Sequence, residues 1–185
     1  MNAAMDHRQR LVDGNSLFKK AVDPALLRRL AKRQEPFVAI LSCSDSRVSP
    51  VKIFNLSLGD AFVVRVAGNS AADPSVLGSL EYAVDHLHVS ALLVLGHTGC
   101  GAVKAVIEAS GLENLRSVVR DIENARVRVS IGQANDENAI AESNVRLQLR
   151  MIEDNSRIVH DAVADGKLTM YGAMYDLATG NVRFI

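Results

Sequence analysis

Three short runs of consecutive apolar residues place the strongest constraint on what this chain can fold into. They cover Phe37–Ser42, Ala61–Val66 and Ala91–Leu95, and each has the length of a β-strand. Continuous apolar character, rather than alternation, is typical of strands in a parallel sheet with helices packed on either face. We therefore predict an α/β fold with a mostly parallel central β-sheet flanked by helices.

The segments between and after these runs carry helical patterns. The clearest helix begins at Asp73-Pro74, where the carboxylate can cap free backbone N–H groups and proline fits the first turn. One face of this helix is apolar and carries Val76, Leu77, Leu80, Ala83, Val84 and Leu87. Further helices are predicted from near Cys100 to a stop at Gly111, over Leu112–Arg128, and, after a polar loop at Gln133–Asn138, over a segment carrying Ile140, Val145, Leu147, Leu149 and Ile152.

The two ends of the chain differ from this central pattern. Asp6–Lys20 and Pro24–Arg33 have helical patterns, so we expect residues 1–33 to form an N-terminal helical arm outside the body. From Lys167 onward, two extended pieces flank a turn at Thr179-Gly180-Asn181, which predicts a C-terminal extended strand or hairpin. Residues 1–185 are then expected to form a single domain.

Length and composition exclude several classes of protein. A chain of 185 residues with 48% hydrophobic residues can bury one core of its own. Its 21 basic and 21 acidic residues cancel, which argues against nucleic-acid binding. The longest aliphatic runs are far shorter than a membrane span, and the first ten residues lack the apolar stretch of a secretory signal. We expect a cytoplasmic protein with no membrane partner.

Both cysteines of the chain lie just after predicted strands. The first run leads into Cys43-Ser44-Asp45-Ser46-Arg47-Val48, and the third leads into Gly96-His97-Thr98-Gly99-Cys100-Gly101. In an open α/β sheet, ligand sites form at the carboxyl ends of the strands, so these two segments are expected to meet. Cys43, His97 and Cys100 would then supply two thiolates and one imidazole, a set that suits zinc. Three protein ligands are typical of a catalytic zinc site, because a structural site is usually closed by four.

Asp45 and Arg47 add a second feature to this predicted site. A carboxylate two residues from a zinc thiolate could take the fourth position on the metal, or it could accept a hydrogen bond from a water molecule there. A guanidinium paired with Asp45 would keep the carboxylate off the metal. The sequence leaves both arrangements open, with Asp45 as a possible fourth ligand in a closed state.

Residues 43–48 and 96–103, Cys-Ser-Asp-Ser-Arg-Val and Gly-His-Thr-Gly-Cys-Gly-Ala-Val, resemble the β-class carbonic anhydrases. The resemblance runs from about Gln34 through Val103 and more loosely over Lys167–Val182. It implies that Cys43, His97 and Cys100 bind zinc, and that Asp45 and Arg47 form the catalytic dyad. It also implies reversible hydration of CO2 to bicarbonate and a proton by zinc-bound hydroxide.

The same resemblance implies a substrate pocket and an oligomer. It assigns Gln34, Phe62 and Tyr82 to the pocket, partly from a neighbouring subunit, with Ala67 adding apolar surface. The backbone N–H of Gly101 would lie near the zinc-bound species. A homodimer or homotetramer is therefore expected, with CO2 and bicarbonate as small-molecule ligands.

Other interpretations remain open at this stage. Hydrolysis of carbonyl sulfide or carbon disulfide could use the same zinc site, and a non-catalytic zinc-stabilised interaction or sensor protein would have Asp45 closing the site. A redox pair of cysteines is a third possibility. Tyr82 could serve only core packing, Gln34 only a solvated loop, and the Asp45/Arg47 pair only the surface.

Overall fold

The computed structural model describes residues 6–110 and 113–185. The chain divides into two compact units, Met1–Gln34 and Glu35–Ile185, and each is described by itself. Among the described helices, none combines the length and apolar character needed to cross a membrane.

The first unit contains two helices, α1 (His7–Ala21) and α2 (Pro24–Leu30). Each begins after an aspartate, Asp6 or Asp23, whose carboxylate accepts a hydrogen bond from a backbone N–H of the first turn. The helices predicted in this region are present, although α2 ends at Leu30 and not at Arg33. None of the residues of α1 is buried.

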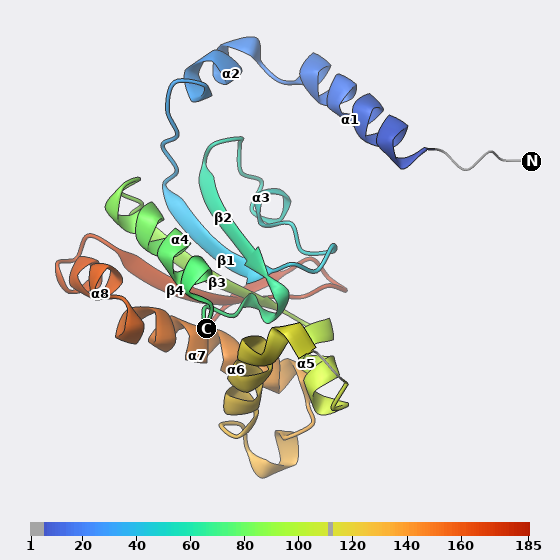
Figure 1. The fold of residues 1–185 in the computed structure, drawn as a ribbon, viewed down its shortest axis with the longest axis vertical. Helices are drawn as coiled ribbons and strands as arrows, with labels where there is room; N and C mark the ends of the chain where they lie inside the picture. Colours follow the sequence, from blue (N-terminus) through green and yellow to red (C-terminus); the bar gives the residue numbers. More distant parts are fainter. Residues whose placement is uncertain (1–5, 111–112) are drawn as a thin grey trace, which may run out of the picture. The chain divides into compact units, whose positions relative to one another are not determined.

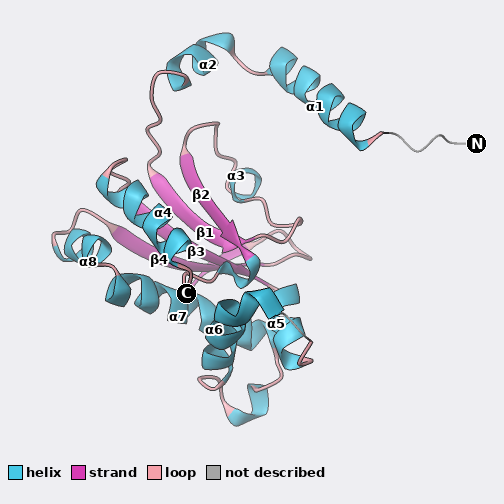
Figure 2. Cartoon of the chain, viewed as in Figure 1, coloured by secondary structure: helices cyan, strands magenta, loops and turns pink. Residues whose placement is uncertain are grey.

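The second unit is built on a five-stranded sheet, shown in magenta in Figure 2. Its strands are β1 (Val38–Cys43), β2 (Ala61–Val66), β3 (Ala91–His97), β4 (Thr169–Tyr175) and β5 (Val182–Phe184). They lie in the order β2-β1-β3-β4-β5, with the first four parallel and β5 antiparallel to β4. The predicted α/β class and the mostly parallel sheet are confirmed.

The helices of this unit lie between the strands in the sequence. They are α3 (Pro50–Ile53), α4 (Pro74–Asp85), α5 (Gly101–Ile107), α6 (Arg116–Arg126), α7 (Glu137–Asn155) and α8 (Arg157–Ala164). Short 3-10 segments occur at Ala67–Asn69, Glu113–Leu115 and Ile131–Gln133. Asp73 caps α4 as predicted, since its carboxylate accepts from the backbone N–H of Ser75.

Several helix boundaries differ from the prediction, and α6 runs over Arg116–Arg126 rather than Leu112–Arg128. The carboxylate of Asp136 accepts from two backbone N–H groups and starts α7 at Glu137, inside the segment predicted as a loop. Ser156 separates α8 from α7 by capping a new helix. Helix α5 ends at Ile107, and the predicted stop at Gly111 lies outside the described residues.

The two faces of the sheet are covered unequally (Figure 1). Helices α4 to α8 belong to the larger core, where Leu41, Leu80, Leu92 and Ile122 are fully buried. The opposite face has a smaller buried cluster that includes Val38, Ile40 and Leu93. Side chains from the end of α3 and the residues just after it, at positions 53, 54 and 56, pack against this cluster. That face retains an apolar pocket of about 360 Å3, lined by Phe37, Val38, Ile40, Phe54, Leu56, Ala91, Leu93, Tyr171 and Phe184.

The strand order also determines where a ligand site is expected. The chain passes from β2 on one side of β1 to β3 on the other side. Such a reversal leaves a crevice outside the carboxyl ends of the two strands that flank it, here β1 and β3. The two cysteine-bearing segments follow these two strands.

Candidate metal centre

Cys43, His97 and Cys100 come together at the carboxyl ends of β1 and β3. Cys43 is the last residue of β1, His97 is the last of β3, and Cys100 is the cap residue of α5. Their sulfur and imidazole nitrogen atoms all lie within 4.8 Å of one another, and all three residues are buried. Within residues 6–110 and 113–185, this is the only group of three or more such side chains close enough to share a metal ion.

The hydrogen bond of His97 determines which ring nitrogen is available to a ligand. Nδ1 lies 2.9 Å from the carbonyl oxygen of Thr98, and a carbonyl can only accept, so Nδ1 carries the proton. Nε2 is then an acceptor, and it is buried without a hydrogen-bond partner. A buried acceptor with no partner costs free energy unless a cation or donor occupies the site. Metal-binding histidines commonly have this arrangement, with the other N–H donating to a carbonyl.

The two cysteine sulfurs are coupled by a hydrogen bond. The Cys100 thiol donates to the Cys43 sulfur, which also accepts from the backbone N–H groups of Asp45 and Gly68. These bonds hold the pKa of Cys43 well below that of a free thiol, although burial opposes them. The same pairing, with burial, raises the pKa of Cys100. The site therefore stabilises negative charge on sulfur, which favours the binding of a cation.

Asp45 and Arg47 form a two-point ion pair beside this cluster. Arg47 donates from Nε to one carboxylate oxygen at 2.9 Å and from Nη2 to the other at 2.7 Å. The backbone N–H of Arg47 donates to the first oxygen as well. The Arg47 side chain is the main reason that the pKa of the Asp45 carboxyl lies well below its usual range. Asp45 is thus an ionised acceptor turned toward arginine, and it is not a member of the Cys43, His97 and Cys100 group.

Arg65 holds the backbone of the same segment in place. From β2, its Nε donates to the carbonyl oxygen of Cys43 at 3.2 Å, and its Nη2 donates to that of Asp45 at 2.7 Å. Arg65 was not among the predicted site residues. A single charged residue in the otherwise apolar run Ala61–Val66 was the available signal.

The turn between His97 and Cys100 is held from two sides. Gly99 has the left-handed backbone conformation (φ 59°) that favours glycine. Its N–H donates to Oδ1 of Asn138 in α7 at 3.0 Å, and its carbonyl lies 3.4 Å from Nη2 of Arg47. The turn therefore connects the Cys100 ligand to both α7 and the arginine. Asn138 was also missed, because the sequence placed it in a loop.

The predicted substrate residues fall into two groups. Ala67 follows β2 and Gly101 follows Cys100, so both lie next to residues of the cluster or its loops. Phe62 and Tyr82 contact each other, with ring centroids 6.1 Å apart. Phe62 pairs with Ala39 of β1. Ala39 lies four residues before Cys43, so the two are about 13 Å apart along the strand.

Phe62 and Tyr82 therefore lie away from the cluster within one chain. Tyr82 also stacks on His86, with ring centroids 4.9 Å apart, and is 43% exposed, so it is not a core residue of the single chain. Gln34 is the last residue of the first unit and is exposed.

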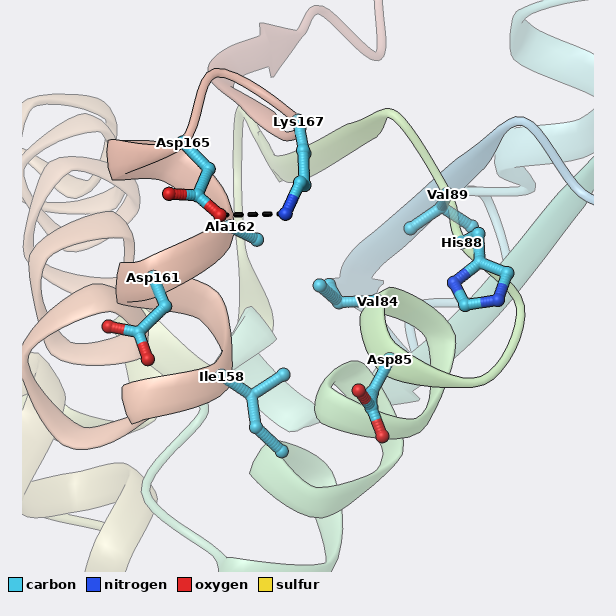
Figure 3. A pocket seen from close by; sticks show the side chains of 9 residues that line it. All are labelled: Val84, Asp85, His88, Val89, Ile158, Asp161, Ala162, Asp165 and Lys167. Atoms are coloured by element: carbon cyan, nitrogen blue, oxygen red, sulfur yellow. Dashed lines mark hydrogen bonds and ion pairs between the residues drawn. The ribbon is translucent and has the colours of Figure 1, made fainter.

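A second pocket, of about 630 Å3, lies between α4 and α8 (Figure 3). Its lining includes Asp85, Asp161 and Asp165, and Lys167 is paired with Asp165 at 2.7 Å. Val89 and Lys167 each lie two residues before the first residue of β3 and β4, so this pocket is at the amino ends of the strands. It contains none of the predicted site residues.

Comparison with known proteins agrees with this geometry. A family model described as carbonic anhydrase matches residues 38–182. Carbonic anhydrase 2 of Mycobacterium tuberculosis is 38% identical over 156 residues, which cover 82% of this chain and 75% of the relative. The carbonic anhydrase of Mycolicibacterium smegmatis is 36% identical over 184 residues, covering 94% of this chain and 89% of the relative.

Solved structures give the same result. The β-carbonic anhydrase CafA of Aspergillus fumigatus matches with a TM-score of 0.88 and 29% identity, over 97% of this chain and 91% of that one. The Coccomyxa β-carbonic anhydrase, solved in complex with acetazolamide, matches with a TM-score of 0.83 and 32% identity, over 98% and 87%. This chain therefore belongs to the β-class carbonic anhydrase family and is a carbonic anhydrase enzyme.

Proposed function

We propose that this enzyme catalyses the reversible hydration of CO2 to bicarbonate and a proton at a zinc ion held by Cys43, His97 and Cys100. The observation that carries the proposal is the buried Nε2 of His97, an acceptor without a partner, grouped with two cysteine sulfurs. Two sulfurs and one imidazole form a donor set that fits zinc. When bound, zinc supplies a Lewis acid that activates water for attack on carbon.

The Asp45/Arg47 pair supports a site that retains an open position. Both oxygens of Asp45 receive hydrogen bonds from Arg47, so the carboxylate is held by arginine rather than free to approach the sulfurs. Oδ2 accepts only one of these bonds and keeps a lone pair, so the ionised carboxylate can accept a proton or orient a donor in the cleft. Arg65 supports this role by holding the Cys43 and Asp45 carbonyls. An Asp45 that closed the site would have to lose both bonds to Arg47.

We also propose that the complete substrate pocket requires a second copy of the chain. Ala67 and Gly101 flank the cluster, whereas Phe62 and Tyr82 lie toward the other end of the sheet. Phe62, Tyr82 and Gln34 would contribute to the pocket of a neighbouring subunit in a homodimer or homotetramer. The exposed apolar sheet face and the unburied α1 support self-association, since an isolated helix of this length is marginally stable in water.

The decisive assay compares two linear substrates on the purified zinc protein. Stopped-flow measurement with a pH indicator should show CO2 hydration well above the buffer rate, with little sulfide released from carbonyl sulfide. Removal of zinc with a chelator should abolish the acceleration, and zinc addition should restore it. Sulfide release without CO2 hydration would assign the site to the alternative hydrolysis, and no turnover of either would favour a non-catalytic zinc protein.

A further inference from the structure

A fully buried polar network lies behind the loop that follows β2. Its side chains are Ser70 in the loop, Asp121 in α6, and Asn144 and Gln148 in α7. Within the described parts of the chain, no cationic side chain forms an ion pair with Asp121. Burying polar groups of this kind is costly, and here Oδ1 of Asp121 is buried without a hydrogen-bond partner, whereas apolar side chains of similar size would pack there at no such cost.

The two amides of α7 bind different parts of this loop. Asn144 donates from Nδ2 to the carbonyl oxygen of Gly68 at 2.8 Å. Gln148 accepts at Oε1 from the backbone N–H of Ala71 at 2.7 Å. Gln148 also donates from Nε2 to Asp121 and to Oδ1 of Asn144, both at 3.1 Å, and Ser70 donates to Asp121. The network therefore fixes the loop at two points, three residues apart.

Gly68 is the point where this network reaches the metal centre. Gly68 lies two residues after Val66, which pairs with Cys43 in the sheet, so its N–H reaches the Cys43 sulfur, while its carbonyl accepts from Asn144. Gly68 has φ 63°, and a β-carbon there would lie 3.1 Å from Ile122 and 3.3 Å from both Ala102 and Val118. Packing and hydrogen bonds thus hold both peptide groups that flank the Gly68 α-carbon in one orientation.

We infer that Asn144 is a positioning residue for the metal centre. By binding the Gly68 carbonyl, Asn144 orients the N–H of Gly68 toward Cys43. This N–H in turn keeps the Cys43 sulfur directed at His97 and Cys100. Hydrogen bonds to the residues that bind a metal commonly have a large effect on metal affinity, because they hold each ligand in the binding orientation. The inference rests on the proposed zinc site, and it assigns to Gln148 a structural role only.

The test compares two substitutions in the same network. Asn144→Leu removes the donor to Gly68 at similar volume. Gln148→Met removes the bonds to Asp121, to Asn144 and to Ala71, which lies farther along the loop from Cys43, but it leaves the Asn144 donor to Gly68 in place. Both side chains are buried on α7, so both variants should unfold at lower temperature than the unmodified protein. Zinc affinity is measured in each by competition with a chromogenic chelator, and the cobalt-substituted proteins are compared through the sulfur-to-cobalt absorption bands.

Asn144→Leu should weaken zinc binding about tenfold and shift the cobalt spectrum, while Gln148→Met should leave both unchanged. Equal effects of the two variants on zinc, or no effect of Asn144→Leu, would overturn the inference. If Asn144→Leu does not fold, Asn144→Ala, with its smaller demand on packing, is measured in the same way and carries the same expectation. Failure of the unmodified protein to bind zinc would instead refute the proposed function itself.

Discussion

At the scale of single residues, His97 is stronger evidence for a metal site than either cysteine. A buried cysteine is commonly only a small apolar side chain. His97 is fully buried, has its Nδ1 proton committed to the Thr98 carbonyl, and presents Nε2 without a partner. A metal ion is the simplest occupant that uses the nitrogen and both sulfurs together.

The Asp45 carboxylate is predicted to act in turnover and not in metal binding. Asp45→Asn keeps the shape of the side chain but removes its charge and the two-point ion pair with Arg47. We expect kcat/KM for CO2 hydration to fall about 100-fold or more, with one zinc per chain retained. Stopped-flow kinetics and metal analysis of the same preparation measure both quantities.

Asp73→Asn is the matched control for this substitution. Asp73 is a helix cap on α4, and asparagine caps helices equally well, so both activity and stability should be unchanged. Loss of zinc from Asp45→Asn would contradict a role confined to turnover, because it would identify Asp45 as a ligand.

Residue type and position were sufficient to predict part of this site. Cys43, His97 and Cys100 could be grouped because soft ligands occurred just after two apolar runs, and parallel strands share one ligand-binding edge. Asn144 and Arg65 could not be predicted in their roles, because both bind backbone carbonyls of distant residues. Any residue offers such a carbonyl, so the partner is determined only by the packing of α7 and β2 on the rest of the fold.

At the scale of elements, glycines in β3 and β4 allow α7 to approach the sheet closely. A β-carbon at Gly96 would lie 2.6 Å from Val145 and 2.8 Å from Met174. We therefore expect Gly96→Ala to lower the free energy of unfolding by about 1–3 kcal/mol, since the added methyl group forces packed neighbours to move. Denaturant unfolding measures the change.

Gly78→Ala adds the same methyl group at a helical position in α4 with no neighbouring atom within 4 Å. It should raise stability by about 0.5–1 kcal/mol, because alanine is the better helix former. Equal effects at the two glycines would show that the close contact of α7 with β3 does not determine stability there.

An ion pair between α7 and β5 predicts a pH-dependent contribution to stability. Glu142 accepts hydrogen bonds from Arg183 in β5 and from Arg146 in α7, and Arg183 is the main cause of the lowered pKa of its carboxyl. A carboxyl group whose pKa is lowered by folding stabilises the fold at pH values above its unfolded-state pKa. This contribution is lost as the pH falls through the folded-state pKa.

Glu142→Gln should therefore reduce stability by about 1 kcal/mol at neutral pH, and its effect should shrink steadily as the pH is lowered below the ordinary carboxyl range. Urea unfolding of both proteins across this range gives the comparison. A difference that persisted unchanged in acid would mean that the ionised pair is not its source.

The strands and longer helices were predictable because their patterns are local. Ala61–Val66 forms a strand over the predicted range, and Asp73 begins α4 as expected. The start of α7 was wrong because Asp136 caps a helix before the apolar pattern begins. The unequal cover of the two sheet faces could not be deduced, since a continuous apolar run indicates burial but not what provides it.

At the scale of the whole molecule, the exposed apolar sheet face predicts self-association. Phe37, Tyr171 and Phe184 are each more than 40% exposed around a pocket lined by Val38, Ile40 and Leu93. Tyr171→Glu should lower the mass measured by sedimentation velocity toward that of one chain. It should also reduce CO2 hydration, if Phe62 and Tyr82 serve a neighbouring subunit.

Val127→Glu is the control, because Val127 is 77% exposed elsewhere on the surface, at the end of α6. It should change neither mass nor activity. An unmodified protein that sediments as a single chain and is fully active would contradict the proposed requirement for a second copy.

The central claim is that Cys43, His97 and Cys100 together hold one zinc ion. X-ray absorption spectroscopy at the zinc edge, on protein with one zinc per chain, tests it most directly because sulfur and nitrogen or oxygen ligands are distinguished by distance. We predict two sulfur ligands at about 2.3 Å and two lighter ligands at about 2.0–2.1 Å. A zinc environment without sulfur, or purified protein that does not retain zinc, would contradict the account.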